Sequence, residues 1–113
     1  MPKNLKLRDP KEKEIQKAIL DWLRWNKVFC WKTNNVGIKK PNGSYIPAGM
    51  KGVSDILGIL KGGVFLAIEV KRKKGILSDY QRDFINKIID NGGVAFEARS
   101  LKDVKDYLKD IFI

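Results

Sequence analysis

The sequence predicts an α/β domain in which a mixed four-stranded sheet carries flanking helices, with the elements in the order αβββαβα. Three observations predict this class. Apolar runs typical of strands alternate along the chain with segments whose apolar residues recur at helical spacing. Capping-box signals begin two of the helical segments, and a pair of glycines separates two of the strands. The 113 residues, 43% of them hydrophobic, suffice for one core, so residues 1–113 are expected to form a single domain.

The first helix is predicted over about residues 10–26. Its start signal takes Asp9 as the N-cap, Pro10 as the first helical residue and Glu12 as the partner that closes a capping box. The residues at helical spacing that define its buried face are Ile15, Ile19, Trp22 and Leu23. Glu12 falls on this face, because it lies three residues before Ile15.

Strands are predicted over residues 28–31, 55–60, 64–71 and 94–98. Gly62-Gly63 favours a tight turn, so the second and third strands should pair antiparallel as a hairpin. Residues 34–52, between the first and second strands, hold four Gly and two Pro. This segment predicts a long loop or an irregular hairpin that turns at Asn42-Gly43, and a loop of that length in so small a domain is usually functional or mobile.

Two further helices complete the predicted order. Ser78 and Gln81 form a capping box that starts the second helix, which ends near Asn91-Gly92-Gly93. Its apolar face is formed by Phe84, Ile85, Ile88 and Ile89. The last helix starts at Ser100, and its apolar residues are Leu101, Val104 and Leu108.

The composition excludes several classes of function. The sequence has no histidine, which removes Ser-His-Asp and Cys-His catalysis and the zinc sites that need imidazole. Its one cysteine, Cys30, excludes an intramolecular disulfide and a multi-cysteine metal cluster, and it is expected to be a small buried hydrophobe. No apolar run approaches the roughly 18 residues of a membrane helix, and the first residues lack the apolar core of a signal peptide. We therefore expect a cytoplasmic, intracellular protein with no membrane partner.

The charge points to a polyanionic partner. Lys and Arg total 23 against 13 Asp and Glu, so the net charge is +10, and nucleic acid is the first expectation. The basic residues expected to contact it lie in two segments, Lys39, Lys40 and Lys51 in the first and Arg72, Lys73 and Lys74 in the second. Trp25 and Trp31 remain open as residues that stack on bases. A basic surface without such a partner is the alternative, and an anionic membrane surface is a weaker one.

The strand over 64–71 carries the candidate chemistry. Its residues alternate between two faces, Leu66, Ile68 and Val70 on one and Phe65, Ala67, Glu69 and Lys71 on the other. An apolar strand after a hairpin should be central, so Glu69 is partly buried, and by itself it could form a structural ion pair with Lys71. Asp55 opens the preceding strand, and antiparallel pairing places it opposite residues near 69–71. Two converging carboxylates predict a Mg²⁺ or Mn²⁺ site, and a lysine beside it is typical of metal-assisted phosphodiester hydrolysis.

These segments resemble a known group of nucleases. Gly52-Val53-Ser54-Asp55 followed by Ile68-Glu69-Val70-Lys71 resembles the PD-(D/E)XK nuclease superfamily, with Ser54 where the superfamily name has proline. More narrowly, the chain resembles the VRR-NUC (virus-type replication-repair nuclease) family. The further segments that carry this resemblance are Glu12 and Glu14 ahead of Ile15-Gln16, Leu77-Ser78 leading to Gln81, Gly92-Gly93, and Arg99-Ser100-Leu101. The resemblance spans about residues 12–108.

The resemblance implies a restriction-endonuclease-like core and a role for Asp55 and for residues 69–71. Asp55 and Glu69 would bind the divalent metal, together with the main-chain carbonyl of Val70. Lys71 would position the attacking water and stabilise the charge that develops.

The resemblance also implies contributions from two helices. A glutamate of the first helix would complete the metal shell directly or through water. Glu12 is preferred to Glu14, which is rotated by roughly 100° and points more to solvent. Gln16 shares the face of Glu12, and we expect an exposed helix residue there, with support for the site as the alternative. Gln81 is expected to orient Lys71 or a phosphate oxygen, the alternative being the cap of Ser78 alone, and Tyr80 is expected to pack rather than take part in chemistry.

Together these features predict a divalent-metal-dependent DNA endonuclease with little sequence readout. The resemblance favours branched or Holliday-junction DNA, as in DNA repair, and the analogy with the superfamily favours a homodimer. The family name suggests a viral or phage-like origin, with the protein acting in the host cell. The alternative is a non-catalytic basic module that binds nucleic acid, and metal dependence separates the two hypotheses.

Overall fold

The computed structural model describes residues 8–34, 38–46 and 49–111. Its elements are α1 (Glu12–Trp25), β1 (Phe29–Lys32), β2 (Ile38–Lys39), β3 (Tyr45–Ile46), β4 (Ile56–Leu60), β5 (Val64–Val70), α2 (Asp79–Asp90), β6 (Val94–Ala98) and α3 (Leu101–Leu108). Apart from the small β2–β3 hairpin, the elements follow the predicted order αβββαβα, and the predicted α/β class is confirmed.

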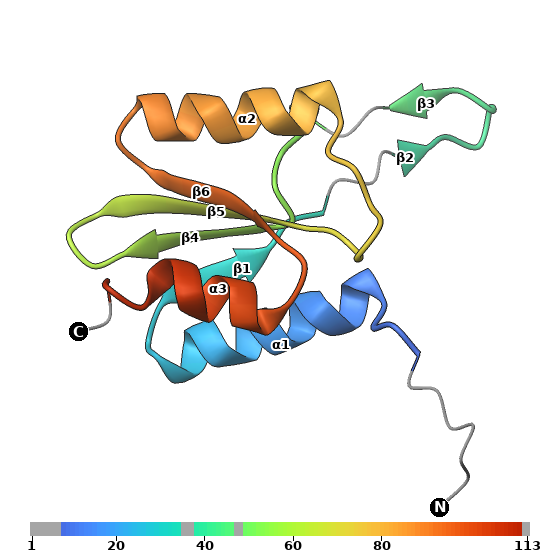
Figure 1. Ribbon diagram of the computed structural model, residues 1–113. Coiled ribbons are helices and arrows are strands. Elements are labelled where there is room, and N and C mark those ends of the chain that lie inside the picture. The colour runs from blue at the N-terminus through green and yellow to red at the C-terminus, as the bar shows by residue number, and fades with distance from the viewer. Residues whose placement is uncertain (1–7, 35–37, 47–48, 112–113) are drawn as a thin grey trace, which may run out of the picture.

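The main sheet has the strand order β1-β4-β5-β6. The pairs β1–β4 and β4–β5 are antiparallel and β5–β6 is parallel, so the sheet is mixed, as predicted. One face of the sheet is covered by α1 and α3 and the other by α2 (Figure 1). β5 lies inside the sheet and is buried from Leu66 to Val70, as its apolar composition predicted.

The alternation along β5 divides its side chains between two apolar layers. Leu66, Ile68 and Val70 pack in the larger layer, with α1 and α3. Ala67 packs in the smaller layer, whose other buried members are Ile85 of α2 and Ala95 of β6. Because side chains on a strand alternate, Glu69 emerges on the α2 side.

The predicted start of α1 is wrong. The N-cap is Lys11, no side chain caps this end, and the capping box between Asp9 and Glu12 does not form. The backbone N–H groups of Glu14 and Ile15 donate to the Lys11 carbonyl at 3.0 and 3.1 Å, which places Asp9 and Pro10 before the helix. The backbone is extended at Lys11, and just ahead of it Arg8 pairs with Glu14 at 2.8 Å. Because the backbone is extended at Lys11, the helix begins after it and Asp9 is not in a position to cap it.

Three of the four predicted strands have bounds that differ by one residue from those observed, and β6 has the predicted bounds. β1 begins at Phe29 rather than residue 28, because Val28 packs in the core and its N–H donates to the Leu23 carbonyl at 2.9 Å. Asp55 lies just before β4 and Lys71 just after β5. Both residues therefore sit at one end of the sheet rather than within its strands.

The segment before Asp55 forms the hairpin that the Asn42-Gly43 turn predicted. β2 pairs antiparallel with β3, Gly43 has a φ of 88°, and its N–H donates to the Lys40 carbonyl at 3.0 Å. The hairpin projects from the body of the molecule beyond the first turn of α2 (Figure 1). Residues 35–37 and 47–48 of the predicted loop lie outside the described residues.

The tryptophans and the cysteine divide between core and surface. Trp22 packs against the larger apolar layer and Cys30 is buried, as predicted. Trp25 is 85% exposed at the end of α1, and the Trp31 ring lies 5.3 Å from that of Phe29. Within the part of the chain that the structure describes, no helix is both long enough and apolar enough to cross a bilayer.

Candidate active site

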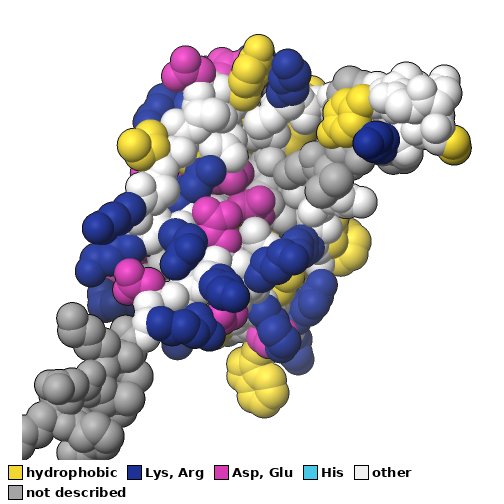
Figure 2. Space-filling view, turned by 90° about the vertical axis from the view of Figure 1, so that its right-hand side faces the viewer, with side chains coloured by type: hydrophobic (Ala, Val, Ile, Leu, Met, Phe, Trp, Pro, Cys, Tyr) yellow, Lys and Arg dark blue, Asp and Glu magenta, His cyan; other side chains and the backbone are white. Residues whose placement is uncertain are grey.

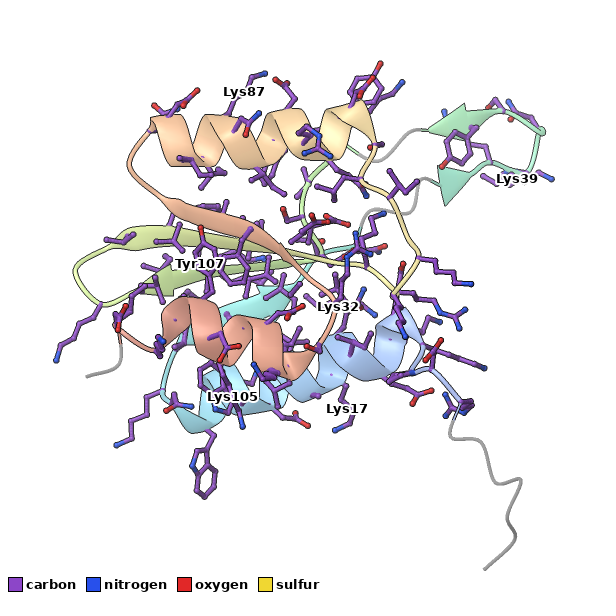
Figure 3. The ribbon with its side chains drawn as sticks, viewed as in Figure 1. Lys17, Lys32, Lys39, Lys87, Lys105 and Tyr107 are labelled. Atoms are coloured by element: carbon purple, nitrogen blue, oxygen red, sulfur yellow. The ribbon has the colours of Figure 1, made fainter. Side chains whose placement is uncertain are left out.

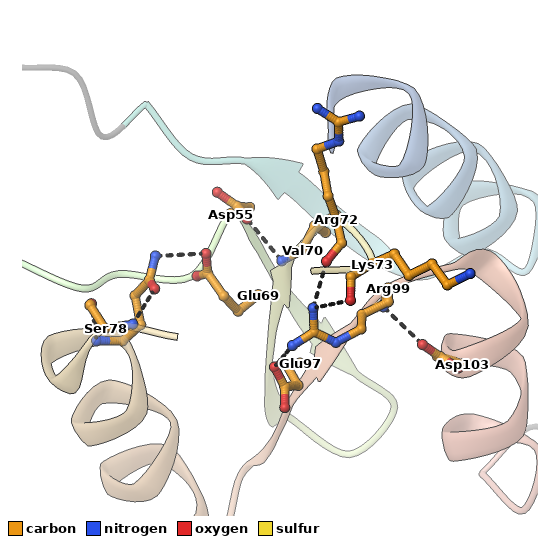
Figure 4. A network of polar contacts seen from close by, with 10 residues as sticks. Asp55, Glu69, Val70, Arg72, Lys73, Ser78, Glu97, Arg99 and Asp103 are labelled. Atoms are coloured by element: carbon orange, nitrogen blue, oxygen red, sulfur yellow. Dashed lines mark hydrogen bonds and ion pairs between the residues drawn. The ribbon is translucent and has the colours of Figure 1, made fainter. Parts of the chain in front are cut away.

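Asp55 and Glu69 come together at one end of the sheet, as the hairpin register predicted. Ile56, the first residue of β4, pairs with Ile68 of β5. Asp55, just before Ile56, and Glu69, just after Ile68, therefore lie opposite one another. The Asp55 Oδ2 atom accepts a hydrogen bond from the Val70 N–H at 2.9 Å (Figure 4). This bond holds the Asp55 carboxylate against the end of β5, beside Glu69.

The backbone that carries Asp55 is held from two sides. The Thr33 side chain, just after β1, donates to the carbonyls of Ser54 and Asp55 at 2.8 and 3.2 Å. On the other side Gly52 has a φ of +81°, and a Cβ atom there would lie 2.3 Å from the Tyr80 carbonyl oxygen. Only glycine permits this approach to the first turn of α2. The Gly-Val-Ser-Asp segment is therefore fixed between β1 and α2.

Glu69 is a carboxyl group that folding removes from water. It is 2% exposed, its Oε1 accepts a hydrogen bond, and its Oε2 is buried with no hydrogen-bond partner among the described residues. Burial first, and then the neighbouring Asp55, raise the pKa of Glu69 to about 9, while Lys71 acts in the opposite direction. A second, weaker charge that raises this pKa is that of Glu12. Two such carboxyl groups are costly to ionise together without a cation.

Gln81 joins the helix cap to this carboxyl group. The Ser78 Oγ atom accepts from the Gln81 N–H at 3.2 Å, and the Gln81 Oε1 atom accepts from the Ser78 N–H at 2.9 Å. The Gln81 side-chain amide then donates to Glu69 Oε1 at 3.0 Å (Figure 4). The cap of Ser78 is thus present, and the side-chain amide of Gln81 is directed at Glu69, whereas its expected role in orienting Lys71 or a phosphate oxygen stays a prediction.

Polar side chains of α1 also lie near Asp55. Glu12, Gln16 and Asp55 line an open cavity of about 550 Å³, together with Lys13, Lys32, Thr33 and Asn34. Gln16 is 7% exposed and its Oε1 is buried without a hydrogen-bond partner among the described residues, so the expectation of an exposed residue is wrong. The cause is tertiary, because Gln16 packs toward the end of the sheet. Glu14 is exposed, as predicted, and pairs with Arg8.

Basic side chains surround the acidic pair. Figure 2 shows Asp and Glu side chains at the centre of this end of the molecule, with lysines and arginines around them. Lys71 is half-buried and follows β5, where its N–H donates to the Ala98 carbonyl at 3.0 Å. Arg72, Lys73 and Lys74 are exposed on the next turn, and they line a cavity of about 330 Å³ with Glu12.

Arg99 holds this basic turn in place, a role that the sequence did not reveal. Its guanidinium donates to the Arg72 carbonyl at 2.5 Å and to the Lys73 carbonyl at 3.4 Å, and it pairs with Glu97 at 3.1 Å (Figure 4). The Arg99-Ser100-Leu101 segment belonged to the resemblance, but no role followed from it. The contact depends on the parallel pairing of β5 with β6, which no local pattern encodes.

The remaining basic residues lie farther from the acidic pair. Lys39 and Lys40 are exposed on the projecting hairpin, where Figure 3 labels Lys39. The Lys51 Nζ atom lies 5.1 Å from the centre of the Tyr80 ring. Tyr80 is 59% exposed, and its ring lies beneath the Lys51 ammonium. Its position before the capped Gln81 directs it out of the apolar layer beneath α2.

The donors at this end of the sheet suit a hard divalent cation. No group of three or more His, Cys, Asp or Glu side chains poised for a metal occurs in the described residues. Two carboxylates and a backbone carbonyl are nevertheless a sufficient protein contribution for Mg²⁺, which keeps several of its waters. The buried, unpartnered Glu69 Oε2 fits such a ligand, because a cation would supply the missing interaction.

Known proteins resemble this chain in sequence and in fold. The family model of the VRR-NUC domain matches residues 10–101, which include Glu12, Asp55, Glu69, Lys71 and Gln81. A solved structure of a VRR_NUC domain protein is similar with a TM-score of 0.62 and 18% sequence identity, covering 90% of this chain and 91% of that chain. No curated protein matches the sequence. The chain therefore belongs to the VRR-NUC domain family, a family of nucleases.

Proposed function

We propose that this protein is a divalent-metal-dependent endonuclease that hydrolyses phosphodiester bonds in DNA with little reading of base sequence. The observation that carries the proposal is the buried Glu69 carboxyl, with one unpartnered oxygen, beside Asp55 at the end of the central strand. Membership of a nuclease family supports the same chemistry.

Asp55, Glu69 and the Val70 carbonyl would hold Mg²⁺ or Mn²⁺, and Glu12 would complete the shell directly or through water. The oxygen donors favour these ions over softer metals. When bound, such an ion supplies charge neutralisation at the scissile phosphate and makes water more acidic. Glu12 lines the cavity that also contains Asp55, and it already raises the pKa of Glu69.

Lys71 and Gln81 would prepare the reacting groups. The Lys71 ammonium would orient the attacking water and stabilise negative charge as it develops on the phosphate. Gln81 would keep the Glu69 carboxylate in one orientation, because its amide donates to one oxygen and leaves the other oxygen for the cation.

The basic residues would bind the DNA backbone. Arg72, Lys73 and Lys74 stand beside Glu12, and contacts from such residues to phosphates position a protein without reporting sequence. Lys39 and Lys40 offer a second contact on the projecting hairpin, which suits branched or junction DNA whose arms diverge. A homodimer, with one site for each strand, is proposed from the superfamily resemblance.

The test is cleavage of flap, four-way-junction and fully paired DNA with Mg²⁺, Mn²⁺ or EDTA. We expect cleavage with either metal, none in EDTA, and a loss of at least about a hundredfold in Asp55→Asn, which keeps an acceptor for Val70. Asp106→Asn, on the exposed side of α3, is the control and should cleave normally. Cleavage that persists in EDTA would overturn the proposal. DNA binding without any cleavage would favour the non-catalytic basic module.

A further inference from the structure

A shallow cavity of about 280 Å³ lies beside the candidate active site, between α2 and the segment that leads to Asp55. The residues that line it are Met50, Lys51, Tyr80, Asp83, Phe84 and Lys87. We infer that this cavity receives one unpaired nucleotide of the DNA substrate, with its base against the Tyr80 ring. The inference rests on the proposed nuclease function and names the feature of DNA structure that the enzyme would select.

The cavity has the apolar surface that a base requires. Tyr80 is 59% exposed and Met50 is 68% exposed, so neither side chain is used in the core. Tyr80, Phe84 and Lys87 are spaced by three or four residues and form one stripe of α2. Any base can stack on an aromatic ring, because every base has a π-face.

The polar groups of the cavity suit the rest of a nucleotide. The Lys51 ammonium lies over one face of the Tyr80 ring, 5.1 Å from its centre. A base that stacks on this face would displace the ammonium, which would then be free to pair with the phosphate of that nucleotide. Asp83 and Lys87 form an exposed ion pair at 3.0 Å, which offers acceptors and donors to a base edge. The net charge of +10 favours a nucleotide over an apolar peptide as the occupant.

The backbone ties the cavity to the acidic pair. Tyr80 directly precedes Gln81, whose amide bonds Glu69, and Lys51 directly precedes Gly52 of the segment that carries Asp55. The two segments are in contact, since a Cβ at Gly52 would lie 2.3 Å from the Tyr80 carbonyl oxygen. A strand whose phosphate lies at Glu69 would therefore present a neighbouring nucleotide to Tyr80.

The occupant must be an unpaired nucleotide. In a duplex the faces of a base are covered by its neighbours, so the Tyr80 ring can meet a base face only after unstacking, which costs a few kcal/mol. Flaps and branch points already contain unstacked bases and avoid this cost. The cavity would thus make the enzyme prefer such DNA without any reading of sequence.

The experiment measures binding in EDTA, so that it does not depend on cleavage. The probes are a flap DNA with 2-aminopurine in its unpaired segment and a fully paired duplex of the same length. Tyr80→Ala should weaken binding of the flap about five- to tenfold and abolish the quenching of 2-aminopurine, while Tyr80→Phe keeps both. Duplex affinity should change by less than about twofold. Phe29→Ala removes an exposed aromatic ring of β1, which pairs with Ile59 at the end of the sheet away from Asp55, and should have no effect.

A second variant tests the proposed contact of the Lys51 ammonium with a phosphate. Lys51→Gln should lower the salt dependence of flap binding by about one phosphate contact, whereas Lys61→Gln, at the turn between β4 and β5, should not. An equal loss of flap and duplex binding in Tyr80→Ala, or failure of Tyr80→Phe to restore flap binding, would overturn the inference. Absence of cleavage by the wild-type protein would instead refute the proposed function, and the two failures are therefore distinguishable.

Discussion

Folding favours the protonated form of Glu69, whereas metal binding in the proposed chemistry requires its ionised form. Burial beside Asp55 raises the pKa of Glu69 from an ordinary value of 4.5 to about 9. Between these two pH values the folded protein binds a proton that the unfolded chain has released. The free energy of unfolding of the metal-free protein should therefore fall as pH rises through this window. A divalent cation must displace that proton, so its affinity should rise over the same window.

The substitution Glu69→Gln isolates this effect. The neutral amide needs no proton, so the free energy of unfolding in EDTA at pH 7 should rise by about 2 to 3 kcal/mol, while cleavage is lost. Urea unfolding should show little gain at pH 5 and a larger gain at pH 8. Glu14→Gln, on the exposed side of α1, is the control and should change stability by less than about 0.5 kcal/mol. Equal gains at both pH values would contradict the interpretation.

Among the elements, the first turn of α2 determines the geometry of the site. It contains the capped Gln81 that bonds Glu69, and its backbone touches Gly52 of the segment that carries Asp55. A displacement of this turn would move groups on both sides of the acidic pair.

Gly52→Ala tests this coupling against a matched glycine. Gly52 and Gly62 both have a positive φ, so alanine costs about 1 kcal/mol of strain at either position. A Cβ at Gly62 meets nothing within 4 Å, whereas at Gly52 it would overlap the Tyr80 backbone. Gly52→Ala should therefore lose more than about tenfold in cleavage and unfold at a lower temperature than Gly62→Ala, as measured by calorimetry and single-turnover assays. Equal behaviour of the two variants would argue against the coupling.

The pairing of Asp55 with Glu69 could be predicted because it depends on local signals. The period-two alternation and the Gly62-Gly63 turn fix the register of β4 against β5, and this register is confirmed. The burial of Gln16 and the role of Arg99 could not be predicted. Both arise from contacts between segments that are far apart in the sequence, since Arg99 follows Arg72 by 27 positions.

Of the two capping signals in the sequence, only one formed. The Asp9-Pro10 start signal agrees with capping rules, but α1 begins after an extended Lys11 and has no side-chain cap. The capping box at Ser78 is present. The approach of Asp55 to the end of β5 could thus be predicted from the sequence, while the start of α1 could not be placed.

At the scale of the whole molecule, the acidic and basic side chains at one end of the sheet are separated, with the acidic ones at the centre and the basic ones around them. At one end of the sheet Asp and Glu side chains lie at the centre of the surface, with lysines and arginines on several sides of them (Figure 2). Such an arrangement attracts a polyanion and brings its phosphates to the acidic centre, where a bound cation would reverse the local repulsion.

The salt dependence of DNA binding tests this arrangement. Lys73→Gln combined with Lys74→Gln should lower the slope of log affinity against log salt by about 2, because each phosphate contact contributes about 0.9. The control combines Lys27→Gln with Lys61→Gln, which removes the same charge around a cavity at the opposite end of β4. An equal reduction in both double variants would show that only net charge matters.

The parallel pairing of β6 with β5 has a consequence for synthesis on the ribosome. The chain emerges with Asp55, Glu69 and Lys71 ahead of β6, yet β6 supplies the carbonyl that binds the Lys71 N–H, and Arg99 follows it. Until residue 98 leaves the exit tunnel, β5 keeps one unpaired edge and the basic turn lacks its anchor. A half-made chain therefore already carries Asp55 and Glu69, but it lacks the Arg99 contacts that hold the basic turn of Arg72 and Lys73 against the end of β6.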